Sequence, residues 1–322
     1  MALVEKRFGV DVTGVFPFYD EPRKAVYRLD VAGGGPLVVR LFPPDRPIER
    51  VEGDAEILGF LAEKGLPVEE VVADLGGATT ASLDGRAVLV TRLIPGGPPA
   101  ITADTLEQMG AALGRMHALP VPAPGSGHLA RRAGSLPRED LALGREWLAA
   151  AEAALPPGRR AEHDALRLAL EATHDGEDLP FGLTHPDCHP GNMVQTPEGR
   201  VVFFDWDGVG QGPRIAALGV LLYSCAIRAP FGAPTTPDIG RVDHIVAGYA
   251  HHARLSAAEQ AHLADAIRFR PLVVTARTLL KTVQRPSPRP DDEAWFTAYD
   301  RAEEVAERTV AALAAAAPQP LR

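Results

Sequence analysis

The chain is poor in cysteine and has no long apolar run, and both absences limit what it can be. Its 322 residues contain two cysteines, Cys188 and Cys225. This count excludes a disulfide framework and predicts a reducing, cytoplasmic location. Charged side chains interrupt residues 1–15, where a secretory signal needs its apolar core. The alanine-rich run 311–317 is too short to cross a bilayer, so we expect no association with membranes.

Positive charge is also in deficit. Lysine and arginine together number 33 against 42 acidic residues, which gives a net charge of −9 and argues against a nucleic-acid partner. Lysine occurs at only four positions, so most basic positions are arginine. The length, with 46% hydrophobic and 23% charged residues, predicts a globular chain with a large core and two lobes. Nothing in the composition indicates an oligomeric state.

The N-terminal part reads as three strands at 15–19, 25–31 and 37–42, followed by a helix over 47–64. Glycines 33–35 predict a hairpin turn, because neither a helix nor a Lys-Ser/Thr pair follows them. At 100° per residue, Asp54 falls within the apolar stripe of the helix. A buried acid needs a partner, and Arg40 on the third strand is the one we expect. The alternative places Asp54 at the edge of the stripe, in water.

The most informative stretch lies near the middle of the chain. Residues 181–184 read as a strand that enters a loop carrying His185, Asp187 and Asn192. Two short strands then flank Thr196-Pro197-Glu198-Gly199, whose Pro and Gly suit a type I turn. If the turn is centred between Glu198 and Gly199, pairing places Asn192 opposite Asp205. An amide oxygen and a carboxylate at that position can share a hard cation such as Mg²⁺.

Further apolar periodicity predicts helices through most of the remaining chain. A segment 86–93 reads as a buried strand, followed by the Pro- and Gly-rich run 94–99. The expected helices open at Asp104 and lie near 141–155, 159–173, 214–228, 238–253, 256–269, 271–283 and 292–314.

The pattern His185-x-Asp187-x-His189-Pro190-Gly191-Asn192, followed by Phe204-Asp205-Trp206, resembles the signature of the aminoglycoside phosphotransferase and choline kinase superfamily. These are protein kinase-like small-molecule kinases, and type II homoserine kinases belong with them. The resemblance implies an α+β, bilobal protein kinase-like fold. Residues 1–95 would form the nucleotide-binding lobe, an antiparallel sheet with a helix. Residues 96–322 would form the mainly helical catalytic and acceptor-binding lobe.

The same resemblance implies roles for the loop residues. Asp187 would orient and deprotonate the acceptor hydroxyl, and His185 would brace the loop. Asn192 and Asp205 would hold Mg²⁺, with Asp207 assisting at a second metal position.

On the nucleotide side, the resemblance implies that Arg40 binds the phosphates of ATP and pairs with Asp54. The backbone from Val90 to Leu93 would contact the adenine. The loop 20–24, which would cover the phosphates, contains no glycine, so the sequence does not show how it grips them.

The implied reaction transfers the γ-phosphoryl group of ATP to a hydroxyl group of a small molecule. The acceptor could be an aminoglycoside-like antibiotic or an amino alcohol such as homoserine. We expect the segments 229–237 and 291–304 to lie near the acceptor. The alternative for the acidic segment 291–304 is a helix start with a solvated face, which is the more common role of such a run.

Three other interpretations stay open. The spacing His185-x-Asp187-x-His189 could hold zinc in a metal hydrolase. The run Asp205-Trp206-Asp207-Gly208 resembles the nucleophile motif of haloacid dehalogenase-like phosphatases, although Val209 stands where they carry Thr. A non-catalytic, kinase-like binding protein would also explain the glycine-free loop. Only the kinase interpretation uses His185, Asp187, Asn192 and Asp205 together.

Overall fold

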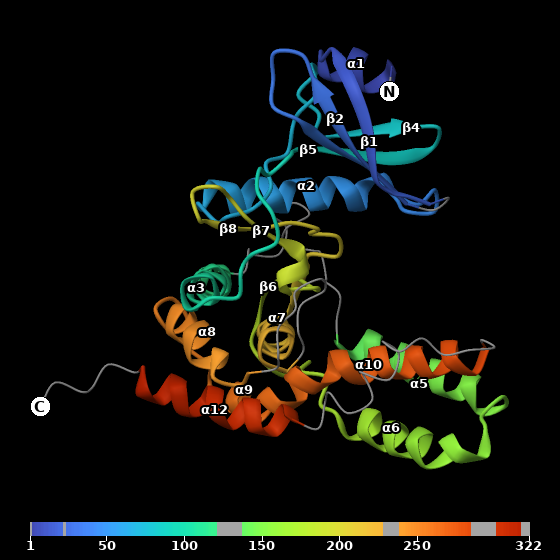
Figure 1. The fold of residues 1–322 in the computed structure, drawn as a ribbon, viewed down its shortest axis with the longest axis vertical. Helices are drawn as coiled ribbons and strands as arrows, with labels where there is room; N and C mark the ends of the chain where they lie inside the picture. Colours follow the sequence, from blue (N-terminus) through green and yellow to red (C-terminus); the bar gives the residue numbers. More distant parts are fainter. Residues whose placement is uncertain (1, 22–23, 121–136, 228–237, 285–300, 317–322) are drawn as a thin grey trace, which may run out of the picture. The chain divides into compact units, whose positions relative to one another are not determined.

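The computed structural model describes residues 2–21, 24–120, 137–227, 238–284 and 301–316 (Figure 1). By their internal contacts these residues divide into two compact units. The first unit comprises residues up to 98 and returns for Met193–Asp207, and the second comprises the rest. The expected division at residue 95 did not include this return. It occurs because Phe203 pairs with Val68 and Gln195 with Gly97, which ties the segment to the first unit.

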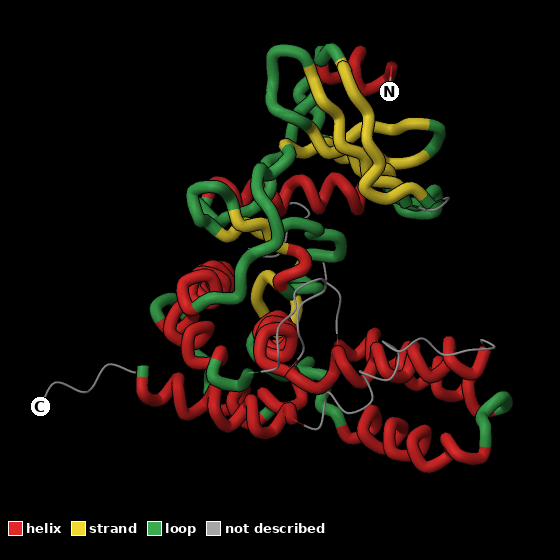
Figure 2. The backbone as a smooth tube through the Cα atoms, in the orientation of Figure 1, coloured by secondary structure: helices red, strands yellow, loops and turns green. Residues whose placement is uncertain are grey.

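The first unit is built on an antiparallel sheet of five strands, in the order β1-β2-β3-β5-β4 (Figures 1 and 2). The strands predicted near 15–19, 25–31, 37–42 and 86–93 are confirmed, as is the helix predicted over 47–64. The N-terminal helix and β4 were not predicted. The bounds are α1 Ala2–Phe8, β1 Val12–Asp20, β2 Ala25–Val31, β3 Leu37–Leu41, α2 Ile48–Glu63, β4 Thr80–Leu83 and β5 Arg86–Arg92.

The two faces of this sheet have different roles. On one face, Val39 and Val90 join Val4 and Phe8 of α1 in a buried apolar cluster. Successive residues of a strand point to opposite faces. Arg40, one position after Val39, therefore lies on the other face of the sheet, and it is this face that carries the pocket described below.

Helix α2 buries the predicted apolar stripe, and Asp54 is buried within it at 2% exposure. The periodicity therefore placed this acid correctly. The alternative of a solvated Asp54 is wrong.

The strands β7 (Met193–Gln195) and β8 (Val201–Phe203) form the predicted hairpin, but its register differs by one residue. Met193 pairs with Phe203, so the pairing is centred on Glu198. The amide of Gly199 donates to the Thr196 carbonyl at 2.8 Å, as a type I turn requires. Gly199 itself has φ 83°, and this extra left-handed residue produces the three-residue loop and its shifted register. The register that would have paired Asn192 with Asp205 is therefore wrong.

The second unit is mainly helical, with one small sheet in which β6 (Phe181–Thr184) pairs with β9 (Gly210–Pro213). Its core gathers apolar residues of α5, α6 and α7 around α10. The predicted helices 256–269 and 271–283 are instead the short α9 and one long α10 that continues through Pro271. The helices are α3 Ala103–Ala118, α5 Pro137–Glu152, α6 Arg160–Ala172, α7 Arg214–Leu222, α8 Arg241–Ala250, α9 Ala257–Ala261, α10 Leu263–Gln284 and α12 Ala302–Ala315.

These elements confirm the predicted fold class: an antiparallel sheet with helices in the first unit and a larger helical second unit. Across the described ranges, no helix combines the length and apolar character that crossing a membrane requires.

Candidate active site

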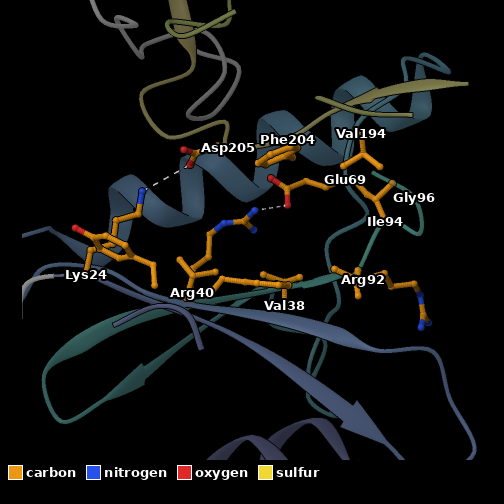
Figure 3. A pocket seen from close by; sticks show the side chains of 14 residues that line it. Lys24, Val38, Arg40, Glu69, Arg92, Ile94, Gly96, Val194, Phe204 and Asp205 are labelled. Atoms are coloured by element: carbon orange, nitrogen blue, oxygen red, sulfur yellow. Dashed lines mark ion pairs between the residues drawn. The ribbon is translucent and has the colours of Figure 1, made fainter. Parts of the chain in front are cut away.

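The first unit contains a pocket of about 590 Å³, within the range of roughly 300–1,000 Å³ typical of small-molecule sites (Figure 3). Val26 and Val38 of the sheet form one apolar wall. Val194 of β7 and Phe204 form the facing wall, and residues 93–96 close one end. Apolar walls on both sides suit a flat, aromatic ligand group.

The segment after β5 reaches the pocket because it pairs with β7. The amide of Gln195 donates to the Gly97 carbonyl at 2.8 Å, and the amide of Gly97 donates to the Gln195 carbonyl at 3.2 Å. The neighbouring Gly96 has φ 133°, and a Cβ atom there would lie 2.1 Å from the Gln195 carbonyl oxygen. Glycine is therefore required at position 96 for this close approach.

Leu93 lines this pocket, as expected, whereas Val90 does not. The Val90 side chain belongs to the cluster beneath α1, and its carbonyl accepts a hydrogen bond from Val72 at 2.9 Å. The Val90 side chain thus faces away from the pocket, and a nucleotide contact of the Val90 backbone stays a prediction. A nucleotide contact at Leu93 stays a prediction.

Arg40 lies in the pocket but does not pair with Asp54. Its guanidinium is 2.7 Å from the carboxylate of Glu69 and donates to the Thr91 hydroxyl at 3.1 Å. Thr91 in turn donates to Glu69 at 3.0 Å. The predicted Arg40–Asp54 pair is therefore wrong. The segment after α2 runs along β5, with Arg92 donating to the Glu70 carbonyl, and this places Glu69 beneath Arg40.

Asp54 finds its cation elsewhere. Arg46, in the loop before α2, lies 3.1 Å from the Asp54 carboxylate and 2.5 Å from that of Asp207. Its guanidinium also lies over the Phe42 ring, 5.0 Å from the centroid. One arginine thus joins a buried acid of α2 to the turn that follows β8.

Asp205 stands at the rim of the pocket in a strained conformation, with φ 59°. A non-glycine residue in the left-handed region is uncommon and tends to occur at functional sites. The ammonium of Lys24 lies 3.6 Å from the Asp205 carboxylate and 3.8 Å from that of Asp207 (Figure 3). The ammonium of Lys24 therefore lies between two carboxylates at this point.

The second unit holds the loop that follows β6, and Asp187 is its most constrained side chain. Arg270 of α10 donates to one carboxylate oxygen at 2.9 Å. His189 lies 3.2 Å from the other oxygen, to which the Asn192 amide also donates at 3.3 Å. Arg270 also reaches Asp140 of α5 at 3.4 Å. The carboxylate of Asp187 is thus held in one orientation by three side chains.

These contacts also set its charge. Burial by itself raises the pKa of Asp187, but the hydrogen bond from His189 and the positive charge of Arg270 outweigh burial. The pKa of Asp187 consequently lies well below its usual range. For Asp140, burial dominates and raises the pKa. Asp187 is therefore the stronger acid of this pair.

His185 is fully buried, and its Nδ1 accepts the amide N–H of Asp187 at 3.2 Å. This contact supports the bracing role that we expected for it. His189 likewise accepts from the amide of Gly191 at 3.0 Å. Within the described residues, no group of three or more His, Cys, Asp or Glu could hold a metal ion, so the zinc hydrolase interpretation receives no support.

Four charged residues of these sites have roles that the sequence did not predict: Lys24, Arg46, Glu69 and Arg270. Glu69 and Arg46 flank α2 and carry no periodic signal. Arg270 lies 83 positions after Asp187 and meets it only through the packing of α10. Lys24 ends the glycine-free loop 20–24, and no motif in that loop indicates a phosphate-binding side chain.

Comparison with known proteins places these features in context. The model of the phosphotransferase enzyme family matches residues 23–257. The homoserine kinase of Rhodopseudomonas palustris (strain TIE-1) is 29% identical over 216 residues, or 64% of this chain and 61% of that protein. The homoserine kinase of Caulobacter sp. (strain K31) is 27% identical over 156 residues, or 45% and 44%. The chain thus spans less than two thirds of these relatives.

Among solved structures, an amicoumacin kinase in complex with AMP-PNP, Ca²⁺ and its ligand superimposes with a TM-score of 0.70. The identity is 18%, and the match covers 96% of this chain and 92% of that one. This likeness shows the fold.

Proposed function

Since the chain belongs to the phosphotransferase enzyme family, we propose that it is a kinase that transfers the γ-phosphoryl group of ATP to a hydroxyl group of a small molecule. The membership confirms the resemblance predicted from the motif at 185–192. The match of the family model covers more than half of the chain but does not specify an acceptor.

The observation that carries the proposal is the restrained, ionised carboxylate of Asp187. Phosphoryl transfer depends on positioning and electrostatic stabilisation more than on covalent chemistry by the protein. Arg270, His189 and Asn192 supply that positioning for Asp187. Its carboxylate can accept the hydrogen bond of an acceptor hydroxyl and later its proton. Because its pKa is low, its main contribution is to orient the hydroxyl.

The pocket of the first unit fits a nucleotide. Apolar walls can receive a base, two basic side chains, Lys24 and Arg40, are candidates for phosphate binding, and Asp205 can supply an oxygen ligand for a divalent cation. We assign the metal to Asp205, with Mg²⁺ as the expected ion, and the metal-binding roles of Asn192 and Asp207 stay predictions. When bound, Mg²⁺–ATP supplies the phosphoryl group and neutralises its charge. The AMP-PNP and Ca²⁺ in the amicoumacin kinase complex support the use of a nucleotide and a divalent cation.

For the acceptor we propose an amino alcohol, with homoserine as the first compound to test. The names of the curated relatives support this choice. The two carboxylates around Arg270, Asp140 and Asp187, are suited to an ammonium group. Of the segments expected near the acceptor, 229–237 and 291–300 lie outside the described residues.

The phosphatase alternative is not supported. The strand that precedes Asp205, β8, pairs antiparallel with β7 in a sheet of two strands. The family match and the kinase-like neighbours also favour transfer over hydrolysis. A non-catalytic binding protein remains the alternative that an activity measurement must decide.

The test is a screen for acceptor-dependent ATP consumption. Homoserine, simple amino alcohols and aminoglycosides are incubated with Mg²⁺–ATP, and the phosphorylated product is identified by mass. Asp187→Asn should retain ATP binding but lose roughly 10²–10⁴-fold in kcat, the range for a positioned base. Asp178→Asn, an exposed acid of the same unit, is the matched control and should keep full activity. If no acceptor is phosphorylated, or Asp187→Asn transfers normally, the proposal fails.

A further inference from the structure

The pocket contains two basic side chains, and their surroundings differ. Arg40 is 10% exposed, with a carboxylate at 2.7 Å and a hydroxyl at 3.1 Å, so a buried carboxylate already balances its charge (Figure 3). Lys24 is 32% exposed and lies 3.6 and 3.8 Å from its two carboxylates. Those distances exceed the usual 2.7–3.2 Å for hydrogen bonds from nitrogen.

The weak hold on Lys24 makes it the cation that can change partners. A partly exposed ion pair at long distance contributes little stability. Moving the Lys24 ammonium from Asp205 to another anion therefore costs little free energy. Moving Arg40 would leave Glu69, 4% exposed, as an uncompensated buried charge, which is strongly unfavourable.

The position of Lys24 also answers the question raised by the glycine-free loop. Kinases use a glycine-rich loop so that backbone N–H groups can approach the phosphates. Here the residues from Asp20 to Lys24 include no glycine. A lysine at the start of β2 can supply the missing interaction from its side chain, as a point charge with three donors.

We propose that Lys24 is the phosphate-binding residue of this pocket, and that without nucleotide its ammonium occupies the place of the divalent cation beside Asp205 and Asp207. This inference rests on the proposed function, since it assigns one contact within the same nucleotide site. In the complex with metal and nucleotide, Asp205 would hold the divalent cation and Lys24 would bind a phosphate group instead of the carboxylates.

Such an exchange predicts two effects of opposite sign in Lys24→Met. Affinity for ADP and ATP should fall by roughly 10- to 100-fold, the range for one hydrogen bond to a charged group. Affinity for adenosine should not change, because it has no phosphate. Affinity for Mn²⁺ alone should rise, because a competing cation has been removed from Asp205. Substitution of a residue with only a structural role would not lower the affinity for one ligand and raise the affinity for another.

The experiment is isothermal calorimetry with adenosine, ADP, ATP and Mn²⁺ as separate probes, and electron paramagnetic resonance as a second measure of Mn²⁺. The proteins are the wild type, Lys24→Met, Lys24→Gln and the conservative Lys24→Arg, which should recover part of the ATP affinity. Lys64→Met is the matched control, because Lys64 lies at the exposed end of α2, over the Phe60 ring. Arg40→Met tests the competing assignment.

The inference is overturned if the neutral Lys24 variants bind ATP as tightly as the wild type, lose adenosine and ATP affinity equally, or leave Mn²⁺ affinity unchanged. If the wild type binds ATP and phosphorylates an acceptor in these cases, the proposed function survives and only the role of Lys24 fails. If the wild type binds none of the nucleotides, both fail together.

Discussion

Replacing Arg46 by methionine tests how strongly this one side chain stabilises the first unit. The Asp54 side chain is 3% exposed, and Arg46 is its ionic partner at 3.1 Å. Methionine retains an apolar stem against Phe42 but removes the Arg46 charge from the buried carboxylate. Removing one partner of a buried pair typically destabilises a protein by about 3–5 kcal/mol. Because Arg46 is itself 17% exposed and Asp207 is 30% exposed, we expect a loss near the lower limit, about 3 kcal/mol.

The assay is urea denaturation monitored by circular dichroism, with the unfolding free energy taken from the first transition. Arg92→Met is the control, because Arg92 and Glu70 form an exposed pair at 54% and 67%, which should contribute less than about 1 kcal/mol. In a double-mutant cycle, Asp54→Asn should recover part of the Arg46→Met loss, with a coupling of about 0.5–3 kcal/mol. Strict additivity, or a loss no larger than in the control, would refute the reasoning.

Two further predictions concern the nucleotide pocket and the catalytic loop. Gly96→Ala should destabilise the first unit by about 1–3 kcal/mol and weaken ATP binding, since it combines a positive φ with a Cβ 2.1 Å from a carbonyl oxygen. Denaturation and calorimetry measure this, and Gly97→Ala, whose Cβ meets nothing within 4 Å, should be nearly neutral. Arg270→Met should lower kcat at neutral pH by about 10- to 100-fold without changing the KM for ATP, because Asp187 loses its orientation. It should also move the acid limb of the pH–rate profile to higher pH: Arg270 lowers the pKa of Asp187, so its removal makes the carboxylate protonate sooner as the pH falls. Arg277→Met on the same helix should alter neither property.

Local sequence determined the features that depend on residue type and period. The motif at 185–192 identified the family and its loop, because the spacing of His185, Asp187 and Asn192 is a property of one short segment. The 3.6-residue period placed Asp54 on the buried face of α2 without knowledge of any partner. Alternation along β3 likewise separates Val39 in the core from Arg40 in the pocket.

Only the tertiary structure decided which charges meet. The buried acid Asp54 of α2 needs a cationic partner, but the sequence of α2 does not specify which one. The partner depends on how the backbone outside α2 folds. The loop before α2 brought Arg46 to Asp54, while the pairing of residues 70–72 with β5 brought Glu69 to Arg40. Arg270 reached Asp187 through the packing of a helix 83 positions away. An ion pair requires the two charges to lie within a few ångströms, whereas the two residues can be far apart in sequence. Sequence periodicity therefore shows that a buried charge needs a partner, and the folded backbone determines which residue is close enough to be that partner.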